Sequence, residues 1–298
     1  MFLGIVGFAV TAAAGAATLT VDCSAGEKIQ DKVLVARPGD TILVSGTCPE
    51  HVRIPAEMMR ITLDGQGKTT INAPSRGDVI WIRGREITVK RFTLSGGRDG
   101  IHLSGAAAGA SAIIDGNLIQ RTGRRGIHMD HGSVGRIAGN TIEDVSEMGI
   151  HINSNSAAWI GYVLIETGLA PNTIRNAGSH GIKVARGSTA RIVGNAIVDN
   201  KGSGIFVNRH SQADVFGNSI SGNAGNGISA SHSAGVNLRV EDLPVKSGAN
   251  QTDASSKNSG VGLSCSVGGY ADGPLGTLSG TKGVKEIESS CVDRLMAP

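Results

Sequence analysis

The chain has 298 residues, of which 44 are glycine and only 3% are aromatic, a composition that suits tight repetitive coils better than a globular core built around rings. The formal net charge is only +3. Because neither a basic stripe nor an aromatic stacking platform accompanies that charge, nucleic acid is not expected as a partner.

The first 17 residues are predicted to be a secretory signal peptide. An apolar run from Phe2 to Val10 is followed by small residues up to Ala17, which offer an A-x-A type cleavage site. The run is shorter than the roughly 18 apolar residues of a membrane span, so no span is expected in the mature chain. The sequence therefore predicts a secreted or periplasmic protein.

Residues 18–48 are expected to form an N-terminal cap and the first coil. Apolar residues at Ile29, Val33 and Leu34 are consistent with a short helix that closes the bottom of the fold. The Pro-Gly-Asp turn at residues 38–40 ends that helix.

Residues 49–232 carry two phrases that repeat with a basic period of 23 residues. Each phrase asparagine lies nine residues before the next phrase glycine. A fixed period of this size indicates a solenoid, because one such unit has no core of its own. The Gly-Ile-X-apolar phrase begins at Gly100, Gly126, Gly149, Gly181, Gly204 and Gly227, and the second phrase is centred on Asn117, Asn140, Asn172, Asn195 and Asn218.

The repeated phrases are short, alternate apolar and polar residues, and are bounded by Gly, Asn and Ser, which is typical of strands. Leucine-rich repeats share the period, but here Ile and Val hold the inward positions, and the residues after each asparagine are too few for a helix. The sequence therefore predicts an all-β fold, a single-stranded right-handed parallel β-helix with a short N-terminal helical cap.

The Ile-X-Gly-Asn-X-Ile and Gly-Ile-X-Val phrases resemble the β-helix repeats of the pectate-lyase-like superfamily over roughly residues 40–230. The resemblance implies the fold but selects no activity, because that superfamily includes lyases, hydrolases, epimerases and proteins without known activity. The acidic clusters of its calcium lyases and the grouped aspartates of its hydrolases are missing from this sequence.

Residues 233–298, where the repeat fades, are expected to form a C-terminal cap with a polar loop from Lys246 to Gly262. Four cysteines lie outside the repeats. If coils rise by about 4.8 Å each, the two ends of the solenoid lie too far apart for a disulfide, whose Cα atoms must be within about 7 Å. The expected disulfides, which agree with export, are Cys23 with Cys48 and Cys265 with Cys291.

Two external columns of side chains form the candidate site. In each Gly-Ile-X-apolar strand, X points outward, so the X residues of successive coils stack about 4.8 Å apart. A second outward column follows two positions along each strand. The first column contains Trp81, His102, His128, His151, Lys183, Phe206 and Ser229, and the second contains Ser104, Asp130, Asn153, Ala185, Asn208 and Ser231.

These side chains favour proton abstraction next to a uronate carboxyl group. A lyase or epimerase needs a base with a pKa near neutral, which His supplies, and a group that neutralises the carboxylate, which Lys, Arg or Asn supplies. The catalytic candidates are His128 and His151 as base, Lys183 as neutralising group and Tyr162 as acid. The substrate-binding candidates are His102, Asp130, Asn153, Arg125 and Trp81.

Variation in coil length is expected to shape a cleft over these columns. Three extra residues follow His102 and nine follow His151, including Tyr162, and we interpret them as raised turns on either side of the coil between. Asp99 and Asp130 are the carboxylates nearest the columns. Strand rise places them about 16 Å apart, which argues against glycoside hydrolysis because its two carboxyl groups lie closer.

The sequence thus predicts an exported monomer that binds an acidic polysaccharide and processes it by lyase or epimerase chemistry. A non-catalytic carbohydrate-binding or structural surface protein stays open as an alternative. A second alternative is a periplasmic site in which the stacked histidines and Asp130 bind Zn or Cu; no other cofactor is expected. The asparagine column is expected to be a structural ladder.

Overall fold

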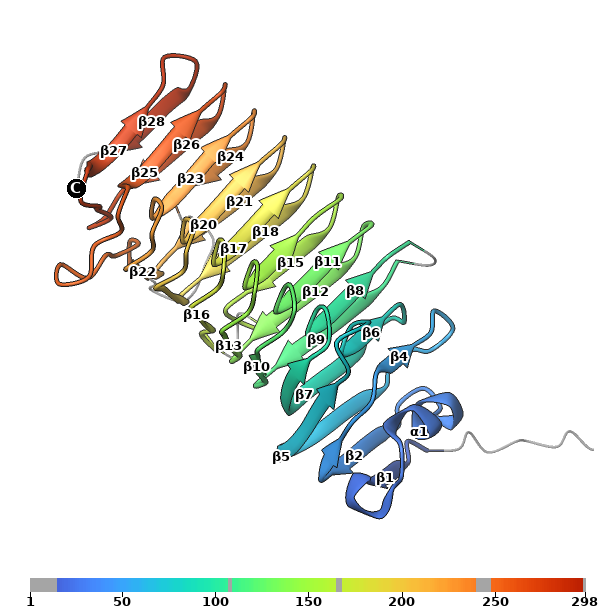
Figure 1. Cartoon of the computed structure of the whole chain (residues 1–298). Coiled ribbons are helices and arrows are strands. Elements are labelled where there is room, and N and C mark those ends of the chain that lie inside the picture. The colour runs from blue at the N-terminus through green and yellow to red at the C-terminus, as the bar shows by residue number, and fades with distance from the viewer. Residues whose placement is uncertain (1–14, 107–108, 165–167, 240–247, 297–298) are drawn as a thin grey trace, which may run out of the picture.

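The computed structural model describes residues 15–106, 109–164, 168–239 and 248–296, which wind into a parallel β-solenoid (Figure 1). The fold prediction is confirmed. The signal-peptide prediction falls mainly on residues outside these ranges. No helix in the described ranges is long and apolar enough to cross a membrane.

One face of the solenoid is a ten-stranded parallel sheet with one strand per coil, paired in chain order. This face carries the two predicted columns. Its strands are β4 (Val52–Ile54), β6 (Ile80–Ile82), β8 (Ile101–Ser104), β11 (Ile127–Asp130), β14 (Ile150–Ile152), β17 (Ile182–Ala185), β20 (Ile205–Asn208), β23 (Ile228–Ser231), β25 (Val261–Ser266) and β27 (Gly283–Ile287).

The other two faces belong to one 18-stranded sheet, because β5 (Thr62–Ala73) and β7 (Ile87–Gly96) pair with strands on both. One of them contains β1 (Thr18–Asp22), β2 (Thr41–Ser45), β9 (Ser111–Asp115), β12 (Val134–Ala138), β15 (Ala157–Ile160), β18 (Thr189–Val193), β21 (Gln212–Phe216), β24 (Gly235–Asn237), β26 (Tyr270–Pro274) and β28 (Val292–Met296). The other contains β3 (Thr47–Cys48), β10 (Leu118–Gln120), β13 (Thr141–Glu143), β16 (Thr173–Arg175), β19 (Ala196–Val198) and β22 (Ser219–Ser221).

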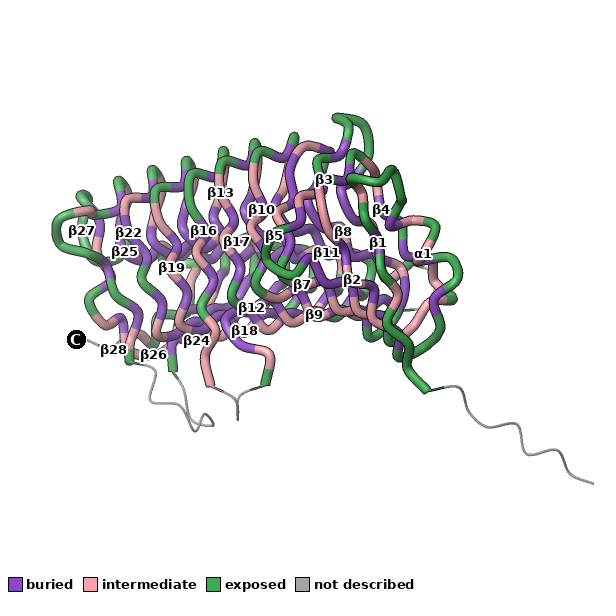
Figure 2. Tube along the Cα trace, turned by 90° about the horizontal axis from the view of Figure 1, so that it is seen from below, coloured by how far each residue is buried: buried purple, intermediate pink, exposed green. Residues whose placement is uncertain are grey.

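Branched aliphatic side chains stack in the interior, one above the other from coil to coil. Ile127 pairs in register with Ile101 and Ile150, and all three are fully buried. Each such side chain contributes about 1.5–3 kcal/mol through burial. Exposed residues gather at many of the turns between the strands, where the chain changes face (Figure 2).

The N-terminal end is closed by a short 3₁₀ helix (Cys23–Ala25) and by α1 (Ile29–Val35), as predicted. The Glu50 carboxylate accepts hydrogen bonds from the first two backbone N–H groups of α1, at 2.8 and 3.2 Å. Ile29 and Val33 are fully buried, but Leu34, the third apolar residue of the predicted helix, is 57% exposed. A helix of this length buries one narrow stripe, and Leu34 lies off that stripe.

The C-terminal region is not a separate cap, contrary to the prediction. Strands β25 to β28 continue the parallel pairing of both sheets to Met296. The described part of the predicted polar loop contributes fully buried Asn250 and Asn258 to the coils. Both predicted disulfides are confirmed, with Cα–Cα distances of 5.2 Å for Cys23–Cys48 and 6.2 Å for Cys265–Cys291.

Buried asparagines form a ladder along one corner, as predicted. Each side-chain amide donates to the carbonyl oxygen of the asparagine in the next coil, at 2.9–3.1 Å from Asn117 to Asn250. A second ladder, not predicted from the sequence, lies among the coils. It joins Asn200, Asn223 and Asn258, each pair at 2.9 Å.

Replacing Asn195 by Ala is expected to lower the free energy of unfolding by about 3 kcal/mol. The Asn195 amide donates to two backbone carbonyl groups at 3.1 and 3.0 Å, and its Oδ1 accepts from the Asn172 backbone N–H at 3.0 Å. The change leaves these buried groups without partners, which thermal unfolding would register. Exposed Asn72→Ala is the control, with an expected loss below about 1 kcal/mol; equal losses would contradict the structural role of the ladder.

Candidate functional site

Aromatic rings stack along the outer surface of the ten-stranded sheet. Trp81, His102, His128 and His151 lie in register on β6, β8, β11 and β14, which confirms the predicted column. Successive ring centroids are 6.3, 4.6 and 5.4 Å apart, and the rings are nearly parallel. Lys183 continues the column on β17.

The histidines point away from the core, yet their neighbours cover them. His128 and His151 are each only 7% exposed, and the Asp130 carboxylate beside them is similarly covered. Burial of several ionisable groups side by side makes their protonation states depend on one another. The column is therefore a coupled charge network and not a solvated surface ladder.

His102 is held between two carboxylates. Its Nδ1 lies 2.9 Å from Asp78 Oδ2, and its Nε2 lies 3.3 Å from Asp130 Oδ2. Burial alone would lower the pKa of His102, but the two carboxylates outweigh it and raise the pKa to about 9. Asp78 also accepts two hydrogen bonds from Arg98, at 3.0 and 3.1 Å. His102 is thus a buried imidazolium at neutral pH.

The stability of the protein is expected to fall between pH 7 and pH 10 because His102 loses its proton there. The folded-state pKa of about 9 lies above the ordinary value of 6.5, so the stabilisation is complete below pH 6.5 and is lost as the pH rises through 9. Thermal unfolding at several pH values should show a shallower decline for His102→Gln than for wild type. The control, exposed His210→Gln, should follow wild type. Equal slopes in all three proteins would show that His102 carries no such charge.

His128 is neutral at pH 7 and accepts a hydrogen bond at one ring nitrogen. Arg125 Nη1 donates to its Nδ1 at 3.0 Å, and its Nε2 lies 3.7 Å from Asp130 Oδ2. Burial, together with the charges of Arg125 and His102, lowers the pKa of His128 despite the nearby Asp99 carboxylate. With its lone pair occupied by Arg125, His128 positions its neighbours and is poorly placed to accept a proton.

The predicted separation of Asp99 and Asp130 is wrong, because both carboxylates lie against the same imidazole. Asp99 Oδ2 is 3.4 Å from His128 Nδ1, and Asp130 Oδ2 is 3.7 Å from Nε2. Asp99 precedes β8, and its side chain reaches across to the next coil instead of following the strand direction. Since Asp99 is fully buried, the two carboxylates still cannot flank a glycosidic bond.

Beyond His128, the column opens into a cavity of about 320 Å³, which we call the cationic cavity. Its charged lining residues are all basic. They are accompanied by the amides of Asn153 and Asn208 and by His151. The basic residues are Arg125, Lys183, Arg186 and Arg209.

His151 contributes an unprotonated ring to the cationic cavity. Neither of its ring nitrogens has a hydrogen-bond partner among the described residues, although both are buried. Burial and the surrounding charges, first that of Arg125, lower the pKa of His151 to about 2. On the adjacent strand, burial and the nearby arginines also lower the pKa of Lys183. The cavity therefore combines a covered imidazole that has no hydrogen-bond partner in the described residues with a concentration of positive charge.

Arg186 and Arg209 escaped the sequence analysis. Each directly follows a second-column residue and has φ of 54°, in the left-handed region that bulky residues rarely adopt. The conformation belongs to the corner itself, because His131, Ser154 and His232 adopt it at the equivalent positions of other coils. The signal of the two arginines in the sequence is positional, since both occupy the same place in consecutive coils.

Tyr162 does not join the histidines. It packs against Val193 and Phe216 on the 18-stranded sheet and is 3% exposed. The nine extra residues lie between Ile160 and Asn172, after β15, and not in the turn after β14 as predicted. The other extra residues precede β9, at a different corner, so the two insertions do not flank a cleft over the histidines.

A metal site is poorly supported by this geometry. The possible ligand atoms of Asp99, His102 and His128 lie within 4.8 Å of one another. However, Arg125 donates to His128 Nδ1, and His102 is protonated between two carboxylates. Zn and Cu need an unprotonated imidazole, so this donor set does not suit them.

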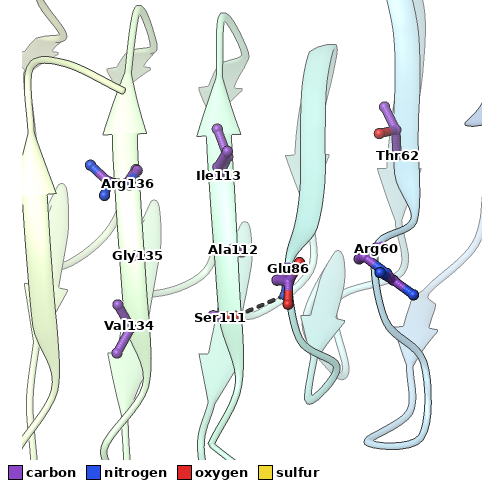
Figure 3. A pocket seen from close by; sticks show the side chains of 9 residues that line it. All are labelled: Arg60, Thr62, Glu86, Ser111, Ala112, Ile113, Val134, Gly135 and Arg136. Atoms are coloured by element: carbon purple, nitrogen blue, oxygen red, sulfur yellow. Dashed lines mark hydrogen bonds between the residues drawn. The ribbon is translucent and has the colours of Figure 1, made fainter. Parts of the chain in front are cut away.

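Buried polar atoms without hydrogen bonds concentrate on this face. All nine such side-chain atoms among the described residues belong to the two columns or to their direct contacts, Asp99 and Arg125, and two of them, His102 Nε2 and Asp130 Oδ1, lie within ion-pair distance of a partner. Native proteins leave few such atoms unsatisfied, and a polar ligand is one way to satisfy them. A hollow of about 430 Å³ on the 18-stranded sheet, lined by Arg60, Glu86 and Arg136 among others, contains none (Figure 3).

Comparison with known proteins supports the fold. A family model described as a right handed beta helix region matches residues 78–242, more than half of the chain. No curated protein matches the sequence.

Several solved structures are similar. The enzymatically active domain of bacteriophage CBA120 tailspike protein 2 gives a TM-score of 0.59 at 13% identity, over 90% of this chain and 43% of that one. The A-module of the Azotobacter vinelandii mannuronan C-5 epimerase AlgE4 gives a TM-score of 0.50 at 11% identity, over 95% of this chain and 91% of that one. A mutant of the periplasmic alginate epimerase AlgG gives a TM-score of 0.48 at 15% identity, over 87% of this chain. The match covers 62% of that enzyme, which is less than two thirds of its length.

Proposed function

The chain belongs to the right-handed β-helix family, and from this premise we propose that it is an exported protein whose cationic cavity binds an acidic polysaccharide and processes it by lyase or epimerase chemistry. The main support for the proposal is that neutral His151 lines the same cavity as Lys183, Arg186 and Arg209, and that no described carboxylate lines it. The mannuronan C-5 epimerase module has the same fold, and we extend its substrate class to this chain because of that cavity.

The cavity suits the first step of uronate chemistry. Arg125, Arg186 and Arg209 offer charge-assisted hydrogen bonds to the sugar carboxylate, and their charge makes the C5 proton more acidic. His151 has a free nitrogen to accept that proton. Burial is the main cause of the low pKa of His151, and the bound carboxylate offsets the smaller contribution of the surrounding cations, which moves the pKa upward.

Lys183 is assigned the role of acid. In a lyase, the electrons of the C5–H bond form a C4–C5 double bond, the C4–O bond breaks, and the leaving oxygen takes a proton from the ammonium group of Lys183. In an epimerase, Lys183 returns a proton to C5 from the opposite face. Its lowered pKa brings it closer to the range in which general acids work at neutral pH.

Export is supported by the two disulfides, because such bonds persist in oxidising compartments. The signal peptide predicted for residues 1–17 fits this localisation. The monomeric state remains a prediction.

Incubation with alginate, polymannuronate and polygalacturonate tests the proposal. Unsaturated ends with new ultraviolet absorbance identify a lyase, and exchange of the C5 proton with deuterated solvent identifies an epimerase. Retardation in an affinity gel without either reaction identifies a binding module, the alternative that the 7% exposure of His151 favours. We expect retardation by the acidic polymers and none by neutral dextran. The proposal is overturned if the protein neither binds nor modifies any uronate polymer.

A further inference from the structure

A second hollow lies on the same face, at the N-terminal end of the ring stack. It has a volume of about 500 Å³ and separates α1 from Trp81. Arg53 pairs with Trp81 across β4 and β6, so the hollow is in line with the histidine column. Its walls include Gln30, Leu34, Arg53, Pro55, Trp81 and Arg83.

Two guanidinium groups face this hollow without acidic partners in the described part of the chain. Those of Arg53 and Arg83 lie 5.9 and 5.5 Å from the centroid of the Trp81 ring, where cation–π attraction holds them. The indole Nε1 of Trp81 is buried and has no hydrogen-bond partner within the ranges that the structure describes. The two planar guanidinium groups match a carboxylate on a polar ring.

The cap helix fixes this arrangement before any ligand arrives. The Gln30 side chain donates to the Arg53 carbonyl oxygen at 3.1 Å and accepts from the Arg53 backbone N–H at 2.7 Å. Glu50 in turn holds the first backbone N–H groups of α1. Leu34, exposed on α1, forms an apolar wall. Binding to such a preformed site costs little ordering entropy.

We propose that this hollow is a second, non-catalytic binding site for another uronate unit of the same polysaccharide chain. The inference rests on the proposed function of the cationic cavity. Trp81 and Lys183 are four strands apart in the ten-stranded sheet, which corresponds to about 19 Å. This distance is longer than one sugar ring. Only an oligosaccharide therefore reaches both sites, and engaging both raises its affinity by roughly 10²–10⁴ over one site.

The test is isothermal titration with oligomannuronates and oligogalacturonates from the disaccharide to the octasaccharide. Wild type should show a drop in Kd of roughly 10²–10⁴-fold at the length that first reaches both sites. The double variant Arg53→Ala/Arg83→Ala should lose this gain and keep the wild-type Kd for short oligomers. Arg85→Ala, an exposed arginine near the hollow but outside its lining, should bind like wild type.

The outcomes separate the two proposals. If short oligomers bind but affinity rises smoothly with length, or the double variant binds long oligomers like wild type, the second site is refuted and the cationic cavity stands. If the double variant weakens short and long oligomers equally, the hollow is not an additional site and the inference again fails. If no oligomer binds wild type, the proposed function fails, and the inference falls with it.

Discussion

Replacing His151 by Gln is expected to lower turnover on uronate polymers by about 10²–10⁴, with a smaller effect on KM. His151 is the histidine of the stack whose ring nitrogens have no partner, and it lines the cationic cavity. Gln keeps a polar side chain in the wall but cannot accept the proton as a base. Solvent exchange of the C5 proton and release of unsaturated ends are the two readouts.

His128→Gln is the matched control, because it alters the neighbouring ring of the same stack. His128 accepts a hydrogen bond from Arg125 and stacks on both adjacent imidazoles, so its replacement should reduce thermal stability and disturb turnover less. A His151→Gln protein with wild-type turnover would remove His151 from the chemistry. Loss of turnover in His128→Gln alone would indicate that His128, the other predicted candidate, is the general base.

Removing two cations from the rim of the cavity is expected to weaken uronate binding by two to four orders of magnitude. Each charge-assisted hydrogen bond contributes about 1.5–3 kcal/mol, and the double variant Arg186→Ala/Arg209→Ala loses one or more from each side chain. Both side chains are exposed, so the fold should survive. Titration with a short oligouronate at low and high salt should also show a reduced dependence on salt.

The control for this double variant is Arg60→Ala/Arg121→Ala. These arginines are also exposed, with φ of 53° and 51°, and lie outside the cationic cavity. The control therefore removes the same charge from the same backbone conformation. If it weakens binding as much as the rim variant, general electrostatic attraction and not the cavity holds the ligand.

The repeat made the fold and the register of the columns predictable. The repeated phrase places equivalent residues above one another although the spacing between coils varies, so His102, His128 and His151 could be aligned by the phrase, and Trp81 by setting Ile80 and Ile82 inward. The same argument placed the asparagine ladder, because buried amides at one corner pair with each other.

Contacts that depend on side-chain reach were not predictable by counting. Asp78 and Asp99 precede their strands, yet their carboxylates cross to the next coil and engage His102 and His128. Those contacts set the charge of the stack. His102 becomes an imidazolium between two carboxylates, whereas His151 stays neutral beside arginines.

Insertions and corners were the second source of error. The spacing between two phrases gives the number of extra residues but not the corner at which they leave the coil, so Tyr162 was assigned to the wrong face. Arg186 and Arg209 were missed because a strand-based reading ends one residue before them. Their left-handed backbone conformation becomes visible only in the structure.

A crystal structure of the His151→Gln variant with a bound oligouronate tests the central claim most directly. The account predicts a uronate carboxylate within hydrogen-bond distance of Arg125, Arg186 or Arg209 and the C5 hydrogen directed toward position 151. An oligomer bound instead in the hollow between Arg60 and Arg136, or an empty cationic cavity at a saturating oligomer concentration, would contradict it.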